Sequence, residues 1–489
     1  MQESTFFLTV RELADLLADG SISSVELTEA YLARAEELDV PPFELPSEPR
    51  TDHDGKLATM VTIARDHALE SAAQADQELA AGNRRSILHG IPYGVKDLLD
   101  TSGIRTTWGS GIFRDRVPDR NAAVIDMLEG AGAVLMAKNS LGEFAGGNTS
   151  SALNPWKLDR TSFGSSSGTV SAAVAGLIGF GIGTETGGSI VFPASAVGAS
   201  GLRPSFGRVS RFGCMALSWS LDKIGPVGRS AEDCGHILQH IAGYDARDNS
   251  TVDRPFVFRA DPGAMRGRRL GVHRPEFLLS GSETTRRVFQ EALDVFEQMG
   301  VVLEDVELPL RPTGALFTTI VTVESGTNFK ALFDDGSAAN MFSFNEDRRA
   351  GWMAGRMLPA ADYLTAQRIR NQLVRETDDI LSRYDAVIAP TWPNGAAMRE
   401  VSEGWPIPAR NEWEPPDDVS LATPRLNYIA NLVGLPGLAI PCGFDEEGLP
   451  LSLQICGSSM DDQAVLDLGM GYQRETDWHR RRPEYPWRE

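Results

Sequence analysis

The chain has 489 residues, enough to bury a large core, and 42% apolar with 23% charged residues is typical of a globular protein. Its formal net charge of −21 argues against nucleic acid or an anionic membrane as a partner, because both favour basic surfaces. The longest apolar stretch, residues 172–182, is too short and too rich in glycine to span a bilayer.

In chain order, the first part of the sequence predicts helices and strands that alternate. A helix at 10–18 ends at Gly20, and a capping box, Ser23-Ser-Val-Glu26, opens a second helix that extends to about residue 38. The prolines at 40–49 predict a loop. The elements expected next are a helix at 62–81, a strand at 91–96, a helix at 122–129 and a strand at 133–137.

The second part continues the alternation. A small, apolar helix at 169–177 directly follows a serine turn, so its first amides should point toward that turn. The residues 395–421, with many prolines and charges, predict a long surface loop. The alternation indicates an α/β fold with a covered sheet. The later elements expected are strands at 270–272, 302–306, 386–389, 438–440 and 451–455, and helices at 283–299, 361–382 and 461–475.

Two serines lie 24 positions apart in glycine-rich turns. Ser165 belongs to Gly164-Ser-Ser-Ser-Gly168, and Ser189 ends the segment Thr186-Gly-Gly-Ser189. A serine in such a turn is most often only a turn residue. However, the second turn offers successive backbone N–H groups with little side-chain cover, as an oxyanion hole requires.

A single lysine, Lys96, ends an otherwise apolar, strand-like run. A buried lysine must pair its charge or lose it, and desolvation lowers its pKa so that a neutral amine can accept a proton. An ion pair with Asp97 or Asp100 is the structural alternative. A serine hydroxyl needs such a base, since it is a poor nucleophile near neutral pH.

An ordered set of motifs resembles the amidase signature family of Ser-Ser-Lys amide hydrolases. Nearly the whole chain is covered, with the weakest match at about 245–420, and the ordered set is far more specific than any one motif. The motifs that carry the resemblance include Gly90-Ile-Pro-Tyr-Gly-Val-Lys96-Asp97, Asn154-Pro155-Trp156, Gly183-Thr-Glu-Thr-Gly-Gly-Ser189, Gly201-Leu-Arg-Pro204, Leu221-Asp-Lys-Ile-Gly-Pro226 and Gly434-Leu-Pro-Gly-Leu-Ala-Ile-Pro441.

This resemblance implies a fold and a mechanism. The fold is one amidase-signature domain over residues 1–489 with a large mixed β-sheet flanked by helices, a core signature at about 85–240 and a variable substrate rim at about 310–420. Ser189 is implied as nucleophile, Ser165 as a bridging serine after a cis peptide bond, and neutral Lys96 as base. No metal and no cofactor are required. The implied oxyanion hole consists of the backbone N–H groups of Thr186, Gly187, Gly188 and Ser189.

The sequence departs from the family pattern at four places. Glu185 stands where aspartate is usual, Val191 where arginine is usual, and Ser167 where the serine motif usually has a glycine. Gly146, followed by Gly147, stands where a methionine often lines the acyl pocket. Missing bulk and a missing cation favour a neutral substrate with a bulky or aryl group, with Gly146 and Gly147 as substrate-binding residues.

The expected function is hydrolysis of the C–N bond of such a carboxamide through an acyl-enzyme. Three rivals stay open: a carbamate (urethane) or ester hydrolase on the same scaffold, a glutamine-amidotransferase A-type subunit that needs partner subunits, and a catalytically silent binding protein. The segment Gly164-Ser-Ser-Ser-Gly168 also matches the nucleophile elbow of an α/β-hydrolase centred on Ser166, with His479 as the candidate histidine.

The remaining expectations concern partners and location. The partner is a small-molecule amide or carbamate, without nucleic acid or membrane, and a homodimer is left open. The chain starts without the basic segment and apolar run of a signal peptide. Its four cysteines form no Cys-x-x-Cys pair and are expected to be buried free thiols. These features together predict a cytoplasmic enzyme.

Overall fold

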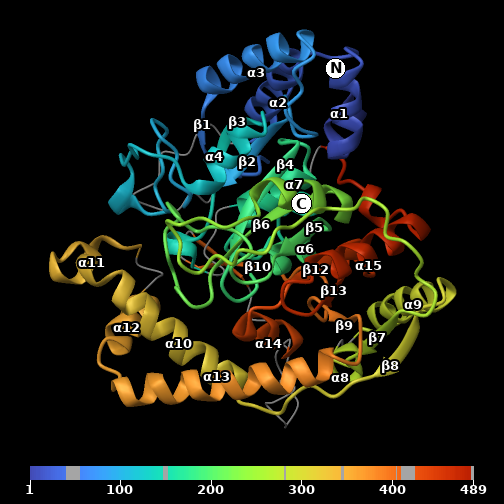
Figure 1. Ribbon diagram of the computed structural model, residues 1–489. Helices are drawn as coiled ribbons and strands as arrows, with labels where there is room; N and C mark the ends of the chain where they lie inside the picture. The colour runs from blue at the N-terminus through green and yellow to red at the C-terminus, as the bar shows by residue number, and fades with distance from the viewer. Residues whose placement is uncertain are drawn as a thin grey trace.

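A computed structural model describes residues 1–39, 55–146, 152–279, 282–342, 346–402, 405–408 and 425–485. Its core is an eleven-stranded sheet that contains both parallel and antiparallel neighbours, which confirms the large mixed sheet (Figure 1). From one edge to the other the strands are β1 (Met60–Ile63), β3 (Val134–Asn139), β2 (Pro92–Lys96), β4 (Phe180–Glu185), β6 (Lys223–Gly228), β5 (Ser200–Arg203), β12 (Gly437–Phe444), β13 (Pro450–Cys456), β9 (Ala386–Pro390), β7 (Arg269–Val272) and β8 (Val302–Asp305).

Helices cover both faces of this sheet. On one face, α5 (Ser167–Val174) and α6 (Val191–Val197) pack against each other and against β2, β4 and β12. Gly201 of β5 faces Ala194 of α6, so its neighbour Leu202 and the paired Leu438 face the opposite side. There Leu438 contacts α15 (Asp462–Glu475), which packs with α7 (Ala231–Ile241). The sheet is therefore buried between two helical layers.

The N-terminal elements match the sequence predictions closely. Helices α1 (Val10–Ala18) and α2 (Ser24–Leu38) each begin with a capping box, on Thr9 and Ser23. Helix α4 (Ala123–Gly130) also lies where it was expected. The helix predicted from residue 62 begins later, as α3 (Arg65–Ala80), because residues 60–63 pair with β3 as strand β1.

The region that follows residue 310 is mostly helical. Helices α10 (Thr313–Asn328), α11 (Lys330–Asp334), α12 (Glu346–Gly355) and α13 (Ala360–Leu381) lie together at the end of the molecule opposite α1–α3 (Figure 1). The long surface loop predicted at 395–421 is wrong in part, because β10 (Arg399–Ser402) and β11 (Trp405–Pro408) pair as a hairpin. Residues 403–404 and 409–421 of that segment, and the proline-rich loop at 40–49, lie outside the described residues.

The remaining helices are short or cover the second half of the sheet. Helix α9 (Glu283–Gln298) packs on β12, and α14 (Arg425–Val433) packs on α13. The others are α8 (Arg274–Phe277) and the 3₁₀ helices η1 (Glu3–Phe7), η2 (Gly111–Phe113), η3 (Glu143–Ala145), η4 (Ser337–Asn340) and η7 (Trp478–Arg480).

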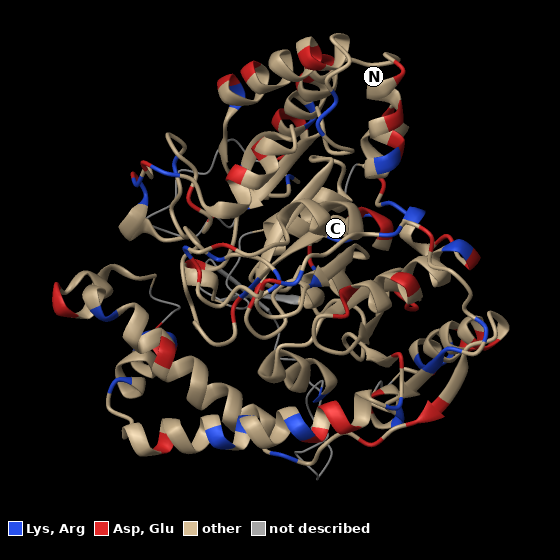
Figure 2. Cartoon of the chain, viewed as in Figure 1, with Lys and Arg blue, Asp and Glu red and all other residues tan. Residues whose placement is uncertain are grey.

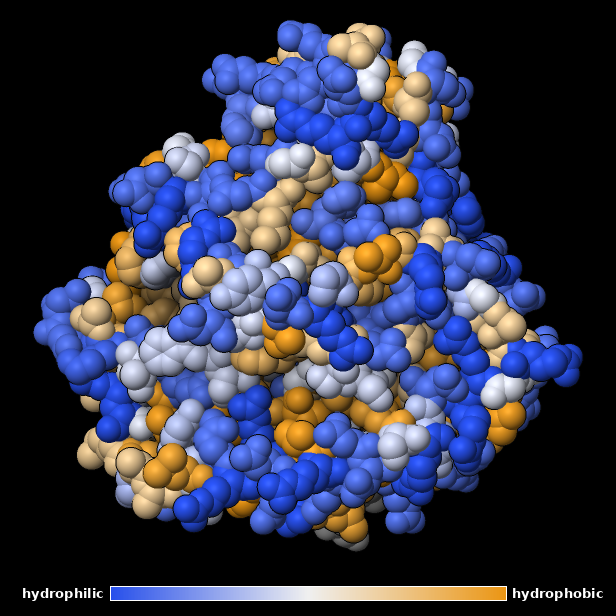
Figure 3. All heavy atoms as spheres, viewed as in Figure 1, coloured by the Kyte–Doolittle hydropathy of each residue, from blue (hydrophilic) through white to orange (hydrophobic). Residues whose placement is uncertain are grey.

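The surface is polar and rich in charge of both signs. The outer helix α13 carries basic and acidic residues, whereas α3 carries mainly acidic ones (Figure 2). The face drawn in Figure 3 is mostly hydrophilic with scattered apolar residues. No helix among the described residues has the length and apolarity that a membrane crossing needs. Cys234, Cys442 and Cys456 are buried free thiols as predicted, whereas the free Cys214 is half-buried.

Candidate active site

The sheet brings the sequence-predicted lysine and serines to one place. Strand β2 ends at Lys96 and runs parallel to β4, with Val95 opposite Ile182. Because the carboxyl ends of parallel neighbours meet at the same sheet edge, the turn after β4 lies beside Lys96. Helix α5 begins just after Ser166 and approaches β4 closely, since a Cβ on Gly181 would clash with the Thr169 side chain. Both serine turns therefore border the end of β2.

Lys96 is buried, and hydroxyl groups surround its amine. The Nζ atom lies 2.7 Å from Ser165 Oγ and 2.9 Å from Ser166 Oγ. Thr184 of β4 contributes its Oγ1 at 2.9 Å and its carbonyl oxygen at 3.3 Å. An amine at this distance from Ser165 can exchange a proton with that hydroxyl directly. Thr184 was not predicted from the sequence, because only the register of β4 beside β2 turns it toward Lys96.

The environment of Lys96 favours the neutral amine. Burial lowers the pKa of Lys96 to about 7, although Cys214, Asp222 and Glu185 act in the opposite direction. A neutral amine is therefore present at neutral pH in a substantial fraction of molecules. The group has the protonation state that a general base requires.

The alternative ion pair between Lys96 and Asp97 does not form. The Asp97 Oδ2 atom accepts hydrogen bonds from the backbone N–H of Thr107 at 2.9 Å and from its hydroxyl at 2.5 Å. The Asp97 Oδ1 atom lies 4.0 Å from the Nζ atom of Lys138, a second buried lysine on β3. Asp100 instead pairs with Arg116 at 2.8 Å. Asp97 and Asp100 thus leave Lys96 to its hydroxyl partners.

The first serine turn has the backbone that the resemblance implies. The peptide bond between Gly164 and Ser165 is cis. The neighbouring Ser166 hydroxyl donates to the Thr184 carbonyl at 3.0 Å and accepts from the Thr184 N–H at 3.2 Å. These contacts hold the start of α5 against β4. They also occupy the hydroxyl of Ser166, whereas an α/β-hydrolase would expose it to a histidine.

The second serine turn joins β4 to α6. Ser189 is half-buried, and its carbonyl oxygen accepts a hydrogen bond from the N–H of Ser166 at 3.1 Å, which ties the two serine turns together. Gly188 has φ of +131°, a conformation that favours glycine. The turn is held from outside by Asp222, which accepts from the Thr186 hydroxyl at 2.6 Å, and by Asn427, which donates to the Gly187 carbonyl at 3.0 Å.

Glu185 connects this turn to the sheet behind it. One carboxylate oxygen accepts from the N–H groups of Ile190 and Val191, at 2.9 and 3.0 Å, in the segment that follows Ser189. The other accepts from Arg203 at 2.7 Å and from Asn431 at 2.9 Å. Burial works against ionisation, but Arg203 is the strongest of the groups that nevertheless lower the pKa of Glu185. The glutamate is therefore a buried anion that fixes the second serine turn.

We expect Glu185→Gln to destabilise the fold by about 3–5 kcal/mol, because it leaves the buried Arg203 without its anion. Urea unfolding followed by circular dichroism measures the change. The control is Glu304→Gln, which removes an exposed ion pair with Arg269 and should shift the midpoint far less. Equal shifts in the two variants would contradict a structural role for the Glu185 carboxylate.

The glycine predicted to line the substrate pocket follows η3. Gly146 has φ of −64°, which any residue can adopt, but a Cβ there would clash with the guanidinium of Arg348. Arg348 donates to the Glu143 carbonyl at 2.9 Å and lies over the Trp352 ring. A cation from α12 therefore occupies the space beside Gly146. Gly147 lies outside the described residues.

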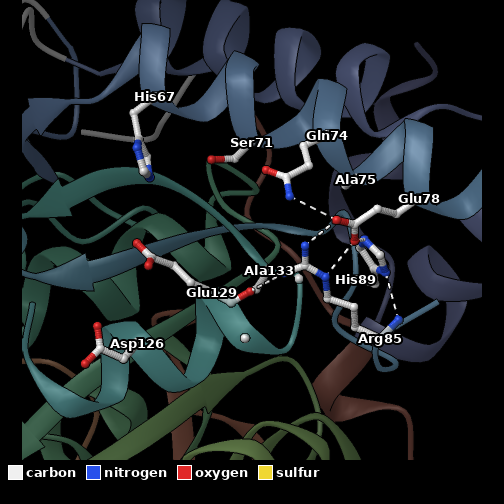
Figure 4. Close-up of a pocket in the computed structure, with 12 residues that line it drawn as sticks. His67, Ser71, Gln74, Ala75, Glu78, Arg85, His89, Asp126, Glu129 and Ala133 are labelled. Carbon is white, nitrogen blue, oxygen red and sulfur yellow. Dashed lines mark hydrogen bonds and ion pairs between the residues drawn. The ribbon is translucent and has the colours of Figure 1, made fainter. Parts of the chain in front are cut away.

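A hollow of about 470 Å³ lies between α3 and α4, away from these residues (Figure 4). Some of its polar groups pair with one another: Glu78 accepts from Gln74 and Arg85, and His89 accepts from the N–H of Arg85. His89 lies before the start of β2 and Lys96 lies at its end, so the length of this strand, about 13 Å, separates the hollow from Lys96. The hollow therefore does not include the sequence-predicted site.

Comparisons with known proteins identify the family of the chain. The family model described as Amidase matches residues 50–466. The A-type subunit of the glutamyl-tRNA(Gln) amidotransferase from Roseiflexus sp. (strain RS-1) is 34% identical, over 98% of each chain. The solved peptide amidase of Stenotrophomonas maltophilia is 28% identical over 98% of each chain, with a TM-score of 0.81. The solved A-type subunit of the Thermotoga maritima glutamyl-tRNA(Gln) amidotransferase is 26% identical, covers 96% of this chain and 94% of that one, and has a TM-score of 0.73. This chain therefore belongs to the amidase family and is an amidase-type enzyme that acts on amide C–N bonds.

Proposed function

We propose that this enzyme hydrolyses neutral carboxamides with a bulky or aryl group through an acyl-enzyme on Ser189. The observation that carries the proposal is the 2.7 Å contact between the buried amine of Lys96 and the hydroxyl of Ser165. The backbone hydrogen bond from Ser166 to Ser189 supports a relay, since it holds the second serine turn next to the first. The proposed catalytic residues are thus Lys96, Ser165 and Ser189.

The proposed reaction moves protons along this relay. Neutral Lys96 takes the proton of Ser165, while Ser165 takes the proton of Ser189, whose oxygen attacks the carbonyl carbon. The N–H groups of residues 186–189 stabilise the oxyanion. Ser165 then protonates the leaving amine as the C–N bond breaks, and the protonated Lys96 returns a proton to Ser165. Water, activated by the same relay, releases the acyl group as a carboxylic acid and restores Ser189.

The partners of Lys96 support this direction of proton transfer. A neutral amine has two N–H groups and one lone pair. Ser166 accepts from the Thr184 N–H and donates to the Thr184 carbonyl, so toward Lys96 it serves as an acceptor. Thr184 Oγ1 is a second acceptor on the amine. With both N–H groups placed on these two oxygens, the lone pair is left to face Ser165.

Two other functions remain specific candidates. A carbamate or ester hydrolase would use the same acyl chemistry. An amidotransferase A-type subunit is favoured by the relatives that share 34% identity with this chain, but such a protein would depend on partner subunits. The arginine that the family usually has in this motif is absent, since Val191 stands there as the first residue of α6.

The test is the purified chain without partners, assayed on matched amides, carbamates and esters that share one acyl group, and on glutamine. The proposal expects turnover of aryl or bulky amides by the lone chain, with a higher kcat/KM than for glutamine. A higher kcat/KM for the matched carbamates would favour the urethanase. Activity on glutamine alone, or only after addition of partner subunits, would favour the amidotransferase.

The proposed substrate contact of Gly146 gives a separate prediction. Gly146→Met should lower kcat/KM for a bulky amide roughly ten- to hundredfold more than for acetamide, because overpacking a close-packed site costs about 1–3 kcal/mol. The control is Gly146→Ala, which also meets the Arg348 guanidinium but adds little volume. An equal loss in the two variants, or on the two substrates, would show that residue 146 acts through Arg348 and does not line the acyl pocket.

We further propose a domain organisation, a class of partner and a cellular location for the enzyme. Residues 1–489 form one domain whose variable rim is at about 310–420, and the partner is a small molecule, with no nucleic acid or membrane. The net charge of −21 supports this choice of partner. The free cysteines support a cytoplasmic location, since secreted proteins usually oxidise their thiols. The homodimer is tested by light scattering of the purified chain.

A further inference from the structure

Phenyl rings pack directly on the backbone of the turn that precedes Ser189. A Cβ on Gly188 would clash with the ring of Phe192, and a Cβ on Gly187 would clash with the ring of Phe317. Because both residues are glycines, the two rings can occupy the space that a side chain would otherwise fill beside this backbone. Any group bound next to these N–H groups lies near aromatic rings.

The ring of Phe192 belongs to an aromatic cluster that reaches both serine turns. The Trp392 ring lies 5.3 Å from Phe192 in an edge-to-face arrangement and 5.0 Å from Phe163. Phe163 immediately precedes the cis peptide bond of Gly164 and Ser165, and Phe192 is the third residue after Ser189. We call Phe163, Phe192 and Trp392 the first aromatic wall.

A second aromatic pair lies against the other glycine. Phe317 of α10 and Tyr428 of α14 pack edge to face, with ring centroids 5.3 Å apart. Helix α10 lies in the region, about 245–420, in which the chain least resembles its family. We call Phe317 and Tyr428 the second aromatic wall, and the variant Phe317→Leu provides a comparison for the first wall.

The first aromatic wall has accessible ring surface and an indole N–H that could bind a ligand. Phe192 and Trp392 are only half-buried, so part of each ring system is accessible. The Nε1–H of Trp392 is buried and makes no hydrogen bond within the part of the chain that the structure describes. A buried indole N–H normally has an acceptor, and aromatic rings prefer edge-to-face or offset contact with another ring.

We propose that the first aromatic wall is an aryl-binding subsite, and that the substrate carries an aromatic ring within two bonds of the scissile amide. The Trp392 Nε1–H donates to an acceptor atom on that substrate. The inference rests on the proposed function, because attack by Ser189 places the reacting carbonyl at Gly187 and Gly188. Substituents of that carbonyl are then within reach of Phe192 and Trp392.

Matched substrate pairs isolate the contribution of the aromatic ring. Phenylacetamide and cyclohexylacetamide place a flat or a saturated ring on the acyl side, and N-benzylacetamide with N-(cyclohexylmethyl)acetamide does so on the amine side. The ratio of kcat/KM within a pair, compared between wild type and variant, removes differences in intrinsic reactivity. The variants are Trp392→Leu and Phe192→Leu, with Trp392→Phe to remove only the N–H and part of the ring.

The expected result is an aryl-to-cyclohexyl ratio that falls about two- to tenfold in Trp392→Leu and Phe192→Leu for at least one pair. Trp392→Phe should fall less. The control Phe258→Leu, whose ring packs on His236 of α7, should keep the wild-type ratio. An unchanged ratio in both first-wall variants, or a fall found only in Phe317→Leu, overturns the assignment.

Labelling of Ser189 separates this inference from the proposed function. The wild type and each variant are treated with a fluorophosphonate, and the adduct on the Ser189 peptide is quantified by mass spectrometry. Labelling in all proteins with unshifted ratios refutes the aryl subsite and leaves the serine mechanism standing. A wild type that is neither labelled on Ser189 nor active on any amide refutes the proposed function, and the subsite with it.

Discussion

Replacing Ser189 with alanine is expected to lower kcat by about 10³- to 10⁶-fold, as loss of the nucleophile does in other serine hydrolases. We expect so large a loss because the neighbouring serine hydroxyl cannot take the place of Ser189. The Ser166 hydroxyl is occupied by Lys96 and Thr184, so it cannot substitute for the missing oxygen. Initial rates on the best amide of the panel measure the effect.

The matched control for this variant is Ser167→Ala. Ser167 lies in the glycine-rich segment of Ser165 and Ser166, and its buried hydroxyl makes no hydrogen bond within the described residues. Its removal should leave kcat near the wild-type value. Urea unfolding should show that Ser189→Ala retains wild-type stability, since Ser189 is only half-buried. Residual activity of Ser189→Ala equal to that of Ser167→Ala would contradict Ser189 as the nucleophile.

Replacing Lys96 should have the second largest effect, because the proposed mechanism has no other base. Lys96→Ala is expected to lose about 10²- to 10⁴-fold in kcat, the usual contribution of general base catalysis. Lys96→Arg should not restore the rate, since guanidinium stays protonated at every accessible pH. Both variants are compared with wild type on an amide and on an activated ester.

The pH dependence of the wild type tests the same group. Burial lowers the pKa of Lys96 to about 7, and only the neutral amine accepts a proton. The kcat/KM value should therefore rise with pH through about 7 and level off above it, and Lys96→Ala should lack this rise. High activity in Lys96→Arg, or a wild-type rate that falls as pH rises through 7, would show that Lys96 acts only as a fixed charge.

The sequence could predict elements with strong local signals. Helices α1 and α2 have capping boxes, and the apolar run before Lys96 forms β2. The central strand β4 was missed because Gly181 and Gly183 lower its strand propensity and resemble a loop. Those glycines are needed where α5 and Ser166 approach the sheet, a tertiary requirement that a local pattern does not reveal.

The candidate site was predictable where its residues lie in motifs and not where distant elements supply partners. Lys96 and Ser165 were predicted and lie 2.7 Å apart. The partners of the second serine turn include Asn427 and Asn431, which come from α14, more than 230 positions along the chain from Ser189. Only the pairing of β5 with β12 and the packing of the C-terminal elements bring such residues together.

The proposed mechanism depends most on Ser189 as the residue that becomes acylated. Treatment of the active wild type with a fluorophosphonate, followed by proteolysis and mass spectrometry, identifies the modified residue directly. The structure and the motifs together predict one adduct, on the peptide that contains Ser189, and none in Ser189→Ala. An adduct on Ser166, with Ser189 unmodified, would contradict the proposed mechanism.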